Sequence, residues 1–245
     1  MKRDLRRVAI LALTAVLAAG MTACEKEDSS SNNSNNGGSN GGGGSTAPAG
    51  FVDLGLPSGL LWAECNLGAS TPEGYGNYYA WGETSPKSDY YWDTYRYANG
   101  DHDQLTKYCN NSSFGYNGFT DDLTTLQAMD DEATQALGSG ARTPTADEWQ
   151  ELLDNTTAIW TTRNGVNGRL LTATNGNSIF LPAAGYRYGT SLHYAGSYGY
   201  YWSSSLLEGY PYGAWVFTFG SSNQDMSNGS RDSGFSVRAV RASQN

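Results

Sequence analysis

The sequence predicts an α+β fold with two short helices, short antiparallel strands and long loops. Only two stretches, residues 123–137 and 143–154, carry apolar residues at helical spacing. Elsewhere, short apolar or alternating runs are separated by Gly, Asn, Ser and Pro, which is typical of strands joined by turns. The ~195 residues from Phe51 to Asn245 are enough for one domain with its own core.

Residues 1–23 are predicted to be a lipoprotein signal peptide. Basic residues between Lys2 and Arg7 precede an apolar run from Val8 to Gly20, which is too short to span a bilayer as a helix. Small residues then precede Cys24, in an order that resembles a bacterial lipobox. We therefore expect Cys24 to become the lipidated N-terminus. A plain signal peptide followed by an incidental cysteine is the alternative.

Residues 24–50 are predicted to be a flexible linker after the lipidated cysteine. The acidic run at 25–28 resembles the surface-export signal of Bacteroidetes lipoproteins, although a merely solvated charge run would look the same. Ser, Asn and Gly then dominate, with too little apolar surface to fold. A linker of this kind spans on the order of 25 Å. It predicts a domain held just off an outer membrane, at the cell surface.

The charge of the chain argues against nucleic acid as a partner. The formal net charge is −9, and it becomes −12 once residues 1–23 are removed. No basic patch is visible in the remaining sequence. Two cysteines besides Cys24 remain, Cys65 and Cys109, and an exported protein could pair them. Two separate thiols are equally compatible with the sequence.

The body of the chain is predicted to begin with a strand pair. Residues 51–63 contain a turn at Pro57-Ser58-Gly59 between two apolar runs. Residues 68–119 show no helical period and predict loops with short strands. The first helix is predicted where Leu123, Leu126, Met129, Ala133, Ala136 and Leu137 share one face, before Gly138.

The second helix, residues 143–154, has a clear start signal. Thr145 and Glu148 have the spacing of a capping box, and Trp149, Leu152 and Leu153 share one face. We expect both helices to pack one face against the core and to expose acidic side chains on the other face.

Short strands are predicted after residue 160. Asn164-Gly165, Asn167-Gly168 and Asn175-Gly176 are turn dipeptides. Residues 178–182 have the composition of a buried strand.

Residues 214–220 alternate strictly in sequence. Trp215, Phe217 and Phe219 are expected to face the core, whereas Val216, Thr218 and Gly220 are expected to face solvent or a ligand. Phe235, Val237 and Ala239 alternate in a final strand.

Residues 186–233 resemble an antibody paratope in composition. Tyr, Ser, Gly and Asn make up 27 of these 48 residues, and Tyr alone makes up eight. Tyr offers a large amphipathic contact area with few torsions to freeze, while Ser, Gly and Asn offer adaptable hydrogen bonds. The segment contains no Lys and one His, which favours recognition over bond-breaking. An ordinary Gly- and Tyr-rich fold with many loops is the alternative.

Several motifs resemble known families. Residues 142–149 and 234–238 are similar to signatures of formylglycine-generating-enzyme-like domains. Residues 52–62, 164–168 and 201–205 more closely resemble the Fibrobacter succinogenes major paralogous domain of Bacteroides lipoproteins. Together these resemblances imply a C-type lectin fold for the chain from residue 51.

The same resemblance implies a variable region at residues 186–233. Members of this group resemble the variable proteins of diversity-generating retroelements, in which adenines, mainly in Asn-type AAY codons, are rewritten. Positions compatible with such codons form the predicted ligand-binding set: Tyr188, His193, Tyr194, Tyr198, Tyr200, Leu207, Gly209, Tyr210, Tyr212, Gly213, Val216, Thr218, Gly220, Asp225, Ser227, Gly229, Ser230, Asp232 and Ser233. Trp202, Trp215, Phe217 and Phe219 would be fixed framework. Glu208 and Gln224 do not fit this codon set, so they are framework or evidence against diversification.

The sequence offers little support for an enzyme. Formylglycine-generating activity needs reactive cysteines or a copper–thiolate site in the C-terminal region, and no Cys follows Cys109. The segment around Ser197 lacks the first Gly of a hydrolase elbow. His102 and His193 are the only histidines, and His102 lies in an acidic, turn-like segment. We therefore expect no catalytic residues and no cofactor.

A metal site is not predicted. No zinc or redox cysteine motif is present, and the calcium-dependent sugar-binding motifs of C-type lectins do not occur. Asp101, Asp103, Asp121 and Asp122 could bind a hard cation through oxygen atoms, although they lack EF-hand spacing.

The sequence thus predicts a lipid-anchored surface protein that binds a protein or glycan ligand on another cell, a phage or a host. A structural or adhesin-type surface lipoprotein that is not diversified is the alternative, and an enzyme of unknown chemistry is the third.

Overall fold

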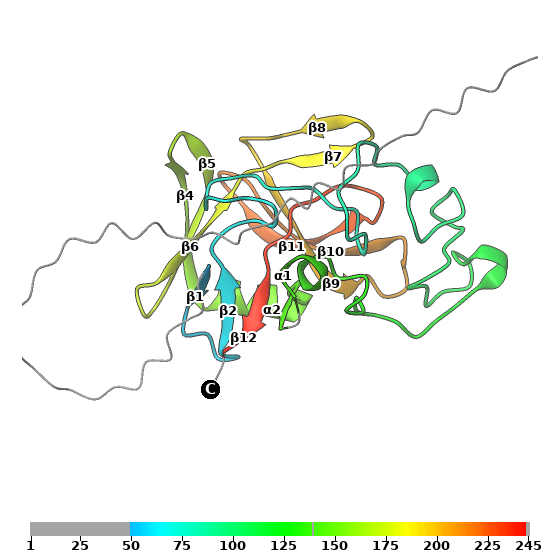
Figure 1. Ribbon diagram of the computed structural model, residues 1–245, viewed down its shortest axis with the longest axis horizontal. Coiled ribbons are helices and arrows are strands. Elements are labelled where there is room, and N and C mark those ends of the chain that lie inside the picture. The colour runs from blue at the N-terminus through cyan, green and yellow to red at the C-terminus, as the bar shows by residue number, and fades with distance from the viewer. Residues whose placement is uncertain (1–49, 139, 244–245) are drawn as a thin grey trace, which may run out of the picture.

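The fold is rich in β-structure. The computed structural model describes residues 50–138 and 140–243, so the predicted signal peptide, Cys24 and nearly all of the linker lie outside the described residues. Within this part of the chain, twelve strands form four antiparallel sheets and only about 11% of the residues are helical (Figure 1). The predicted α+β class, with its C-type lectin arrangement, is therefore wrong.

The first sheet joins the two ends of the described chain. Its strands are β1 (Phe51–Asp53), β2 (Leu60–Ala63), β12 (Val240–Ala242) and β3 (Ala141–Arg142), in that order. Trp62 of β2 lies opposite both Val52 and Val240. The predicted turn between β1 and β2 is confirmed, since Gly59 has a φ of 67° and its N–H donates to the Leu56 carbonyl at 2.9 Å. A left-handed φ of this kind favours glycine.

The second sheet is a meander of β4 (Thr156–Arg163), β5 (Val166–Ala173) and β6 (Ser178–Pro182). The predicted turns at Asn164-Gly165 and Asn175-Gly176 are confirmed and join these strands. The turn predicted at Asn167-Gly168 is wrong, because both residues lie inside β5. Gly168 serves packing instead, since a Cβ at this position would lie 2.3 Å from the Leu181 carbonyl oxygen.

The remaining strands carry the predicted ligand-binding segment. β9 (Gly199–Leu206), β10 (Gly213–Phe219) and β11 (Gln224–Ser230) form one sheet, with β10 in the centre. β7 (Tyr186–Tyr188) and β8 (Ser191–His193) form a separate hairpin. In Figure 1 this yellow hairpin lies at the top of the molecule, away from the β1, β2 and β12 strands at the bottom.

The helices are α1 (Glu132–Leu137), α2 (Ala146–Asp154) and two single 3₁₀ turns, η1 (Trp92–Thr94) and η2 (Tyr116–Gly118). The predicted second helix and its capping box are confirmed. The Glu148 N–H donates to Thr145 Oγ1 at 3.2 Å, and the Thr145 N–H donates to the Glu148 carboxylate at 2.8 Å. Trp149 and Leu152 are buried on the inner face, and Leu153 packs partly buried beside them.

The predicted first helix is present only in its second half. Residues 123–131 are not helical, and the backbone of residues 124–126 pairs with β9 instead. The Leu126 N–H donates to the Ser204 carbonyl at 2.9 Å, and the Leu206 N–H donates to the Thr124 carbonyl at 2.8 Å. α1 therefore begins only after Asp131, whose side chain accepts a hydrogen bond from the Thr134 N–H.

Two hydrophobic clusters cover the two faces of the β9–β10–β11 sheet. Trp202 and Val216 belong to one cluster, whereas Tyr201 and Phe217, their neighbours along the same strands, belong to the other. Successive side chains of a strand point to opposite faces, so both faces of the sheet are covered at β9 and β10, whereas the edge strand β11 is partly exposed. The predicted final strand at Phe235, Val237 and Ala239 is wrong, because β12 begins only at Val240, and Ser236 and Arg238 are buried as well as these three residues. None of the helices in the described residues is long and apolar enough to cross a membrane.

Candidate functional site: a tyrosine-rich surface

Six aromatic residues of the predicted set and its flank form one surface, hereafter the tyrosine surface. They are Tyr186, Tyr188, His193, Tyr194, Tyr198 and Tyr200. Ring contacts join five of them, and the sixth, Tyr188, lies on the same side of β7 as Tyr186. The β7–β8 hairpin positions the first three, because Tyr186 pairs with His193 in the ladder. Their rings stack with centroids 5.3 Å apart and an interplanar angle of 26°. Pairing across strands thus fixes the first part of the surface.

A tight turn positions the next two tyrosines. Tyr194 adopts a left-handed φ of 55°, and its carbonyl accepts hydrogen bonds from the Ser197 and Tyr198 N–H groups at 3.0 and 3.1 Å. The Gly185 N–H donates to the Tyr198 carbonyl at 2.7 Å, which fixes the far end of the turn. The Tyr194 and Tyr198 rings meet edge to face with centroids 5.7 Å apart.

Phe235 forms the floor of the tyrosine surface. Its ring centroid lies 5.8 Å from that of Tyr186 and 5.4 Å from that of Tyr200, and it contacts the buried Trp202 at 4.3 Å. Phe235 is only 5% exposed. The surface aromatics are therefore joined to the core by ring contacts, which limits their motion.

The outer tyrosines have hydroxyl groups available to a ligand. Tyr188, Tyr194 and Tyr198 are 47%, 58% and 41% exposed. No hydrogen bond to another described residue engages their hydroxyl groups. Burial raises the pKa of Tyr186 and Tyr200, so both remain neutral at physiological pH. The surface therefore offers neutral aromatic area with hydroxyl donors, a combination suited to recognition.

A second group of predicted residues lies apart from the tyrosine surface. Tyr210 and Tyr212 contact each other, and Tyr212 meets His102 edge to face at 5.8 Å and Phe114 at 5.2 Å. The loop around Gly209 is held to residues 110–111, since Asn111 Nδ2 donates to the Gly209 carbonyl at 3.1 Å. Tyr210 is 58% exposed, so this group forms a second aromatic patch.

Several predicted binding positions are buried and do not form a ligand surface. They are Gly213, Val216, Gly220, Asp232 and Ser233. The prediction that Val216 faces solvent or a ligand is wrong, because Val216 is 0% exposed and belongs to the first hydrophobic cluster together with Trp202 and Phe235. Trp215, expected in the core, is partly exposed.

Two glycines of the predicted set also leave no room for larger side chains. A Cβ on Gly229 would lie 2.3 Å from the Phe235 ring, and one on Gly220 would lie 2.9 Å from the Tyr198 ring.

Burial raises the pKa of Asp232, whose carboxylate accepts a hydrogen bond from Ser230 Oγ.

The rest of the predicted set is partly or fully exposed along β9 to β11. Leu207, Thr218, Ser227, Gly229 and Ser230 are partly exposed, and Asp225 is exposed. Thr218 Oγ1 donates to the Asp225 carbonyl across the strand pair at 3.3 Å. These positions offer a shallow polar flank without aromatic anchors.

The possible Cys65–Cys109 disulfide is not formed in the structure. Cys109 is a free, buried thiol, and its Sγ donates to the Asn111 carbonyl at 3.2 Å. Burial raises the pKa of this thiol, which keeps it protonated. Cys65 lies just after β2 and is 8% exposed.

The acidic residues considered for calcium divide into two groups. Asp101, His102 and Asp103 each place one potential ligand atom within 4.8 Å of the others. The Asp121 carboxylate instead accepts the Tyr108 and Cys109 N–H groups at 2.8 and 3.0 Å, so it shapes its loop. Asp122 is exposed outside the first group.

The C-terminal half of the described chain matches a family model. Residues 154–240 match a family described as a domain of unknown function (DUF8237). This range runs from the last residue of α2 to the first residue of β12 and includes the tyrosine surface. No curated protein and no solved structure matches the chain.

A pocket of mixed polar and apolar lining, which the sequence did not reveal, adjoins the tyrosine surface. It has a volume of about 470 Å³ and lies between residues 76–90 and the β7–β8 hairpin. Gly189 of the hairpin exchanges two backbone hydrogen bonds with Tyr90, both at 3.1 Å. Tyr91, next to Tyr90, meets Tyr188 edge to face at 5.1 Å. One short segment therefore contacts both the pocket and the tyrosine surface.

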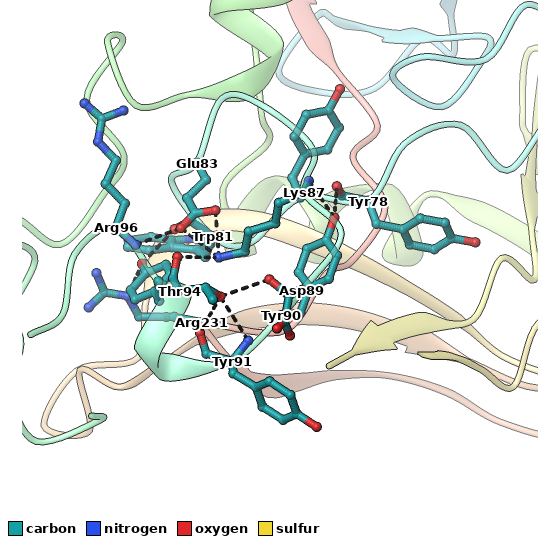
Figure 2. Close-up of polar contacts among 12 residues, drawn as sticks. Tyr78, Trp81, Glu83, Lys87, Asp89, Tyr90, Tyr91, Thr94, Arg96 and Arg231 are labelled. Atoms are coloured by element: carbon teal, nitrogen blue, oxygen red, sulfur yellow. Dashed lines mark hydrogen bonds and ion pairs between the residues drawn. The ribbon is translucent and has the colours of Figure 1, made fainter. Parts of the chain in front are cut away.

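Figure 2 shows the contacts that hold one wall of this pocket. Lys87 Nζ pairs with the Glu83 carboxylate at 3.0 Å and donates to the Thr94 carbonyl at 3.0 Å. The Tyr90 hydroxyl donates to the Tyr78 carbonyl at 2.7 Å, and its oxygen accepts the Lys87 N–H at 3.3 Å. The only sequence signal for the pocket is Arg187, a cation between two tyrosines in a strand.

Proposed function

We propose that this protein is a lipid-anchored binding protein of the outer membrane, displayed at the cell surface, that recognises a protein or glycan ligand through the tyrosine surface. The observation that carries the proposal is the position of Tyr188, Tyr194 and Tyr198. These side chains are exposed at their outer ends, and the residues beside them rest on the buried Phe235. Rigid aromatic anchors lose little entropy on binding, and Tyr is common at the centres of interfaces.

The proposed ligand is carried by another cell, a phage or a host, and nucleic acid is not proposed as a partner. The formal net charge of −9 supports this restriction, since a nucleic-acid surface needs excess Lys and Arg. No catalytic role is proposed for the aromatic residues. Their contribution is contact area, with hydrogen bonds from tyrosine hydroxyls.

The proposal includes diversification of the surface by a retroelement, limited to positions that can accept change. Tyr188, Tyr194, Tyr198 and Tyr210 are exposed and fit the codon set. Val216, by contrast, is fully buried. The burial of several positions of the predicted set favours one competing proposal, a fixed adhesin or structural surface lipoprotein.

Sequencing the gene across many cells of the source population tests diversification. We expect adenine-derived substitutions at codons 188, 194, 198 and 210, with codons 216, 232 and 233 unchanged. A near-copy repeat and a reverse transcriptase gene should lie nearby. An invariant segment without these neighbours would support the fixed adhesin instead.

Binding is tested with the full chain on a glycan array and on intact bacterial cells. The test variant replaces Tyr188, Tyr194 and Tyr198 together by Ala. The matched control replaces Tyr116 and Phe119 by Ala, because these are also exposed aromatics but lie around η2. We expect the test variant to lose binding at least tenfold, with the control unchanged. Equal binding by both variants would overturn the site assignment.

A further inference from the structure

The pocket beside the tyrosine surface concentrates positive charge in an acidic chain. Its lining includes Lys87 and Arg187 and no Asp or Glu, although the chain carries a net charge of −9. Asn77, Ser88 and Thr190 also belong to the lining, and Asn77 Nδ2 donates to the Tyr79 hydroxyl at 3.4 Å. Such a mixture of cations and neutral polar groups fits a ligand that has one negative charge and several hydroxyl groups.

Arg187 is the strongest feature of the pocket. Its guanidinium carbon lies 5.4 Å from the centroid of the Tyr78 ring, which orients the group. No described residue forms a hydrogen bond or an ion pair with this guanidinium. Arg142 and Arg163, in contrast, pair with Glu148 and Glu73. The fork of donors on Arg187 is therefore available, and it matches the two oxygens of a carboxylate.

Lys87 adds a second cation that is fixed in place. Two of its three donors are used by Glu83 and the Thr94 carbonyl, so one donor is left. Its side chain is 19% exposed, and Glu83 balances its charge. Arg187 therefore supplies the uncompensated charge of the pocket, whereas the Lys87 ammonium is held by Glu83 and the Thr94 carbonyl (Figure 2).

The walls of the pocket are rigid, which favours a small ligand. Tyr78 and Tyr90 are 7% and 1% exposed, and both hydroxyl groups are bound to backbone carbonyls. Burial raises the pKa of Tyr78 to about 12, so the wall stays neutral around physiological pH. A volume of about 470 Å³ is within the range of small-molecule sites and suits one or two sugar rings.

We infer that this pocket binds the carboxylate of an acidic sugar, such as a uronic acid, at the edge of the tyrosine surface. Arg187 holds the carboxylate, and Asn77, Ser88 and Thr190 face the sugar hydroxyl groups. The inference deepens the proposed function and rests on it, because it names a carboxylated glycan as the ligand class. β7 presents Tyr186 and Tyr188 to the tyrosine surface and Arg187, which lies between them, to the pocket.

Titration of the full chain with glucuronic acid tests this inference by calorimetry and by NMR. Glucose and the methyl ester of glucuronic acid serve as neutral probes, and inorganic phosphate and glutamate serve as other anions. We expect glucuronic acid to bind with a dissociation constant on the order of millimolar, as suits one small ligand. The neutral probes should bind at least tenfold more weakly. Tighter binding of phosphate or glutamate, or equal binding of glucose, would overturn the inference that the pocket binds a carboxylated sugar.

The test variant is Arg187→Gln, and the matched control is Arg163→Gln. Both substitutions remove one positive charge, but Arg163 lies on β4, which does not line the pocket. We expect Arg187→Gln to weaken glucuronic acid binding at least tenfold and Arg163→Gln to leave it within twofold. Equal effects would mean that the binding depends on overall charge, which would overturn the pocket. A thermal melt of each variant confirms that it is folded.

The triple Tyr→Ala variant separates this inference from the proposed function. It should bind glucuronic acid as the unmodified chain does, because Tyr188, Tyr194 and Tyr198 do not line the pocket. If glucuronic acid fails to bind while array binding still depends on the tyrosines, only the acidic-sugar inference falls. If glucuronic acid binds but the tyrosines have no effect on array binding, the proposed function falls.

Discussion

The guanidinium carbon of Arg231 lies 4.9 Å from the centroid of the Trp81 ring, and both side chains are fully buried. Arg231 donates hydrogen bonds to the Tyr95 hydroxyl and to the carbonyls of Lys107, Tyr108 and Pro211. None of these acceptors is a carboxylate. A single cation therefore joins the long loop of residues 81–108 to the end of β11 through dipoles and aromatic rings.

Replacement of Arg231 by Lys should lower the free energy of unfolding by about 3 kcal/mol. A lysine has three donors on one atom and cannot reach acceptors spread around a planar fork, so buried carbonyls lose their partners. Urea denaturation measures the loss, and Arg163→Lys is the control because that side chain is half exposed. A loss below about 1 kcal/mol, the usual range for exposed sites, would show that Arg231 does not hold the loop.

Glu132 should make stability depend on pH. The residue is 0% exposed, and one of its carboxylate oxygens, Oε2, has no hydrogen-bond partner. Burial, followed by the negative charge of Asp131, raises the pKa of the Glu132 carboxyl well above its ordinary value. Below the pKa that Glu132 has in the unfolded chain, the carboxyl is protonated in both states, and burying it costs no charge desolvation. As the pH rises above this pKa, the unfolded chain ionises first, so the folded state loses stability.

Glu132→Gln should remove this dependence. The variant should match the unmodified protein near pH 4 and exceed it progressively as the pH rises. The difference can grow by at most about 1.4 kcal/mol per pH unit for one proton. Asp130 does not disturb the comparison, since its ionisation is common to both proteins. Urea unfolding at a series of pH values measures the difference, and a constant difference from pH 4 to 7 would contradict the assignment.

Two neighbouring positions of the predicted variable set should lose different amounts of stability on the same substitution. Val216 is 0% exposed between Trp202 and Phe235, whereas Thr218 is partly exposed. Val216→Asn should cost about 3 kcal/mol, because it buries an amide without partners. Thr218→Asn should cost less than about 1 kcal/mol. Chemical denaturation of the two variants gives the comparison, and equal losses would mean that both positions face the same environment.

This pair also shows how far the sequence could predict the fold. Alternation along β10 correctly separates two faces, but it does not reveal whether a second layer covers the outer one. That layer includes residues 78–81 and Phe235, which lie far apart along the chain, so its presence depends on tertiary packing. α2 was predictable because its cap and its apolar face are local. The loss of helix over residues 123–131 was not predictable, because residues 124–126 pair with β9, far along the chain.

The candidate site was predictable in part for the same reason. The composition of residues 186–233 indicates an aromatic surface. Tyr186 and His193 then come together through hairpin pairing, which is a local interaction. The pocket was not predictable, since it forms only where β7 meets residues 76–90. Gly189 makes this approach possible, because a Cβ there would lie 2.5 Å from the Tyr91 hydroxyl.

Substitutions in the tyrosine surface and substitutions in its floor should differ in how much they lower the free energy of unfolding. Tyr194 and Tyr198 have exposed outer ends and contact mainly other surface rings, so replacing both by Ala should cost about 1 kcal/mol or less. Phe235 is buried under Tyr186 and Tyr200 and contacts Trp202, so Phe235→Ala should cost about 3–5 kcal/mol. Differential scanning calorimetry and urea unfolding of the two variants measure these costs. A double Tyr variant that loses as much as Phe235→Ala would mean that these rings support the fold, and the proposed binding surface would then lose its physical basis.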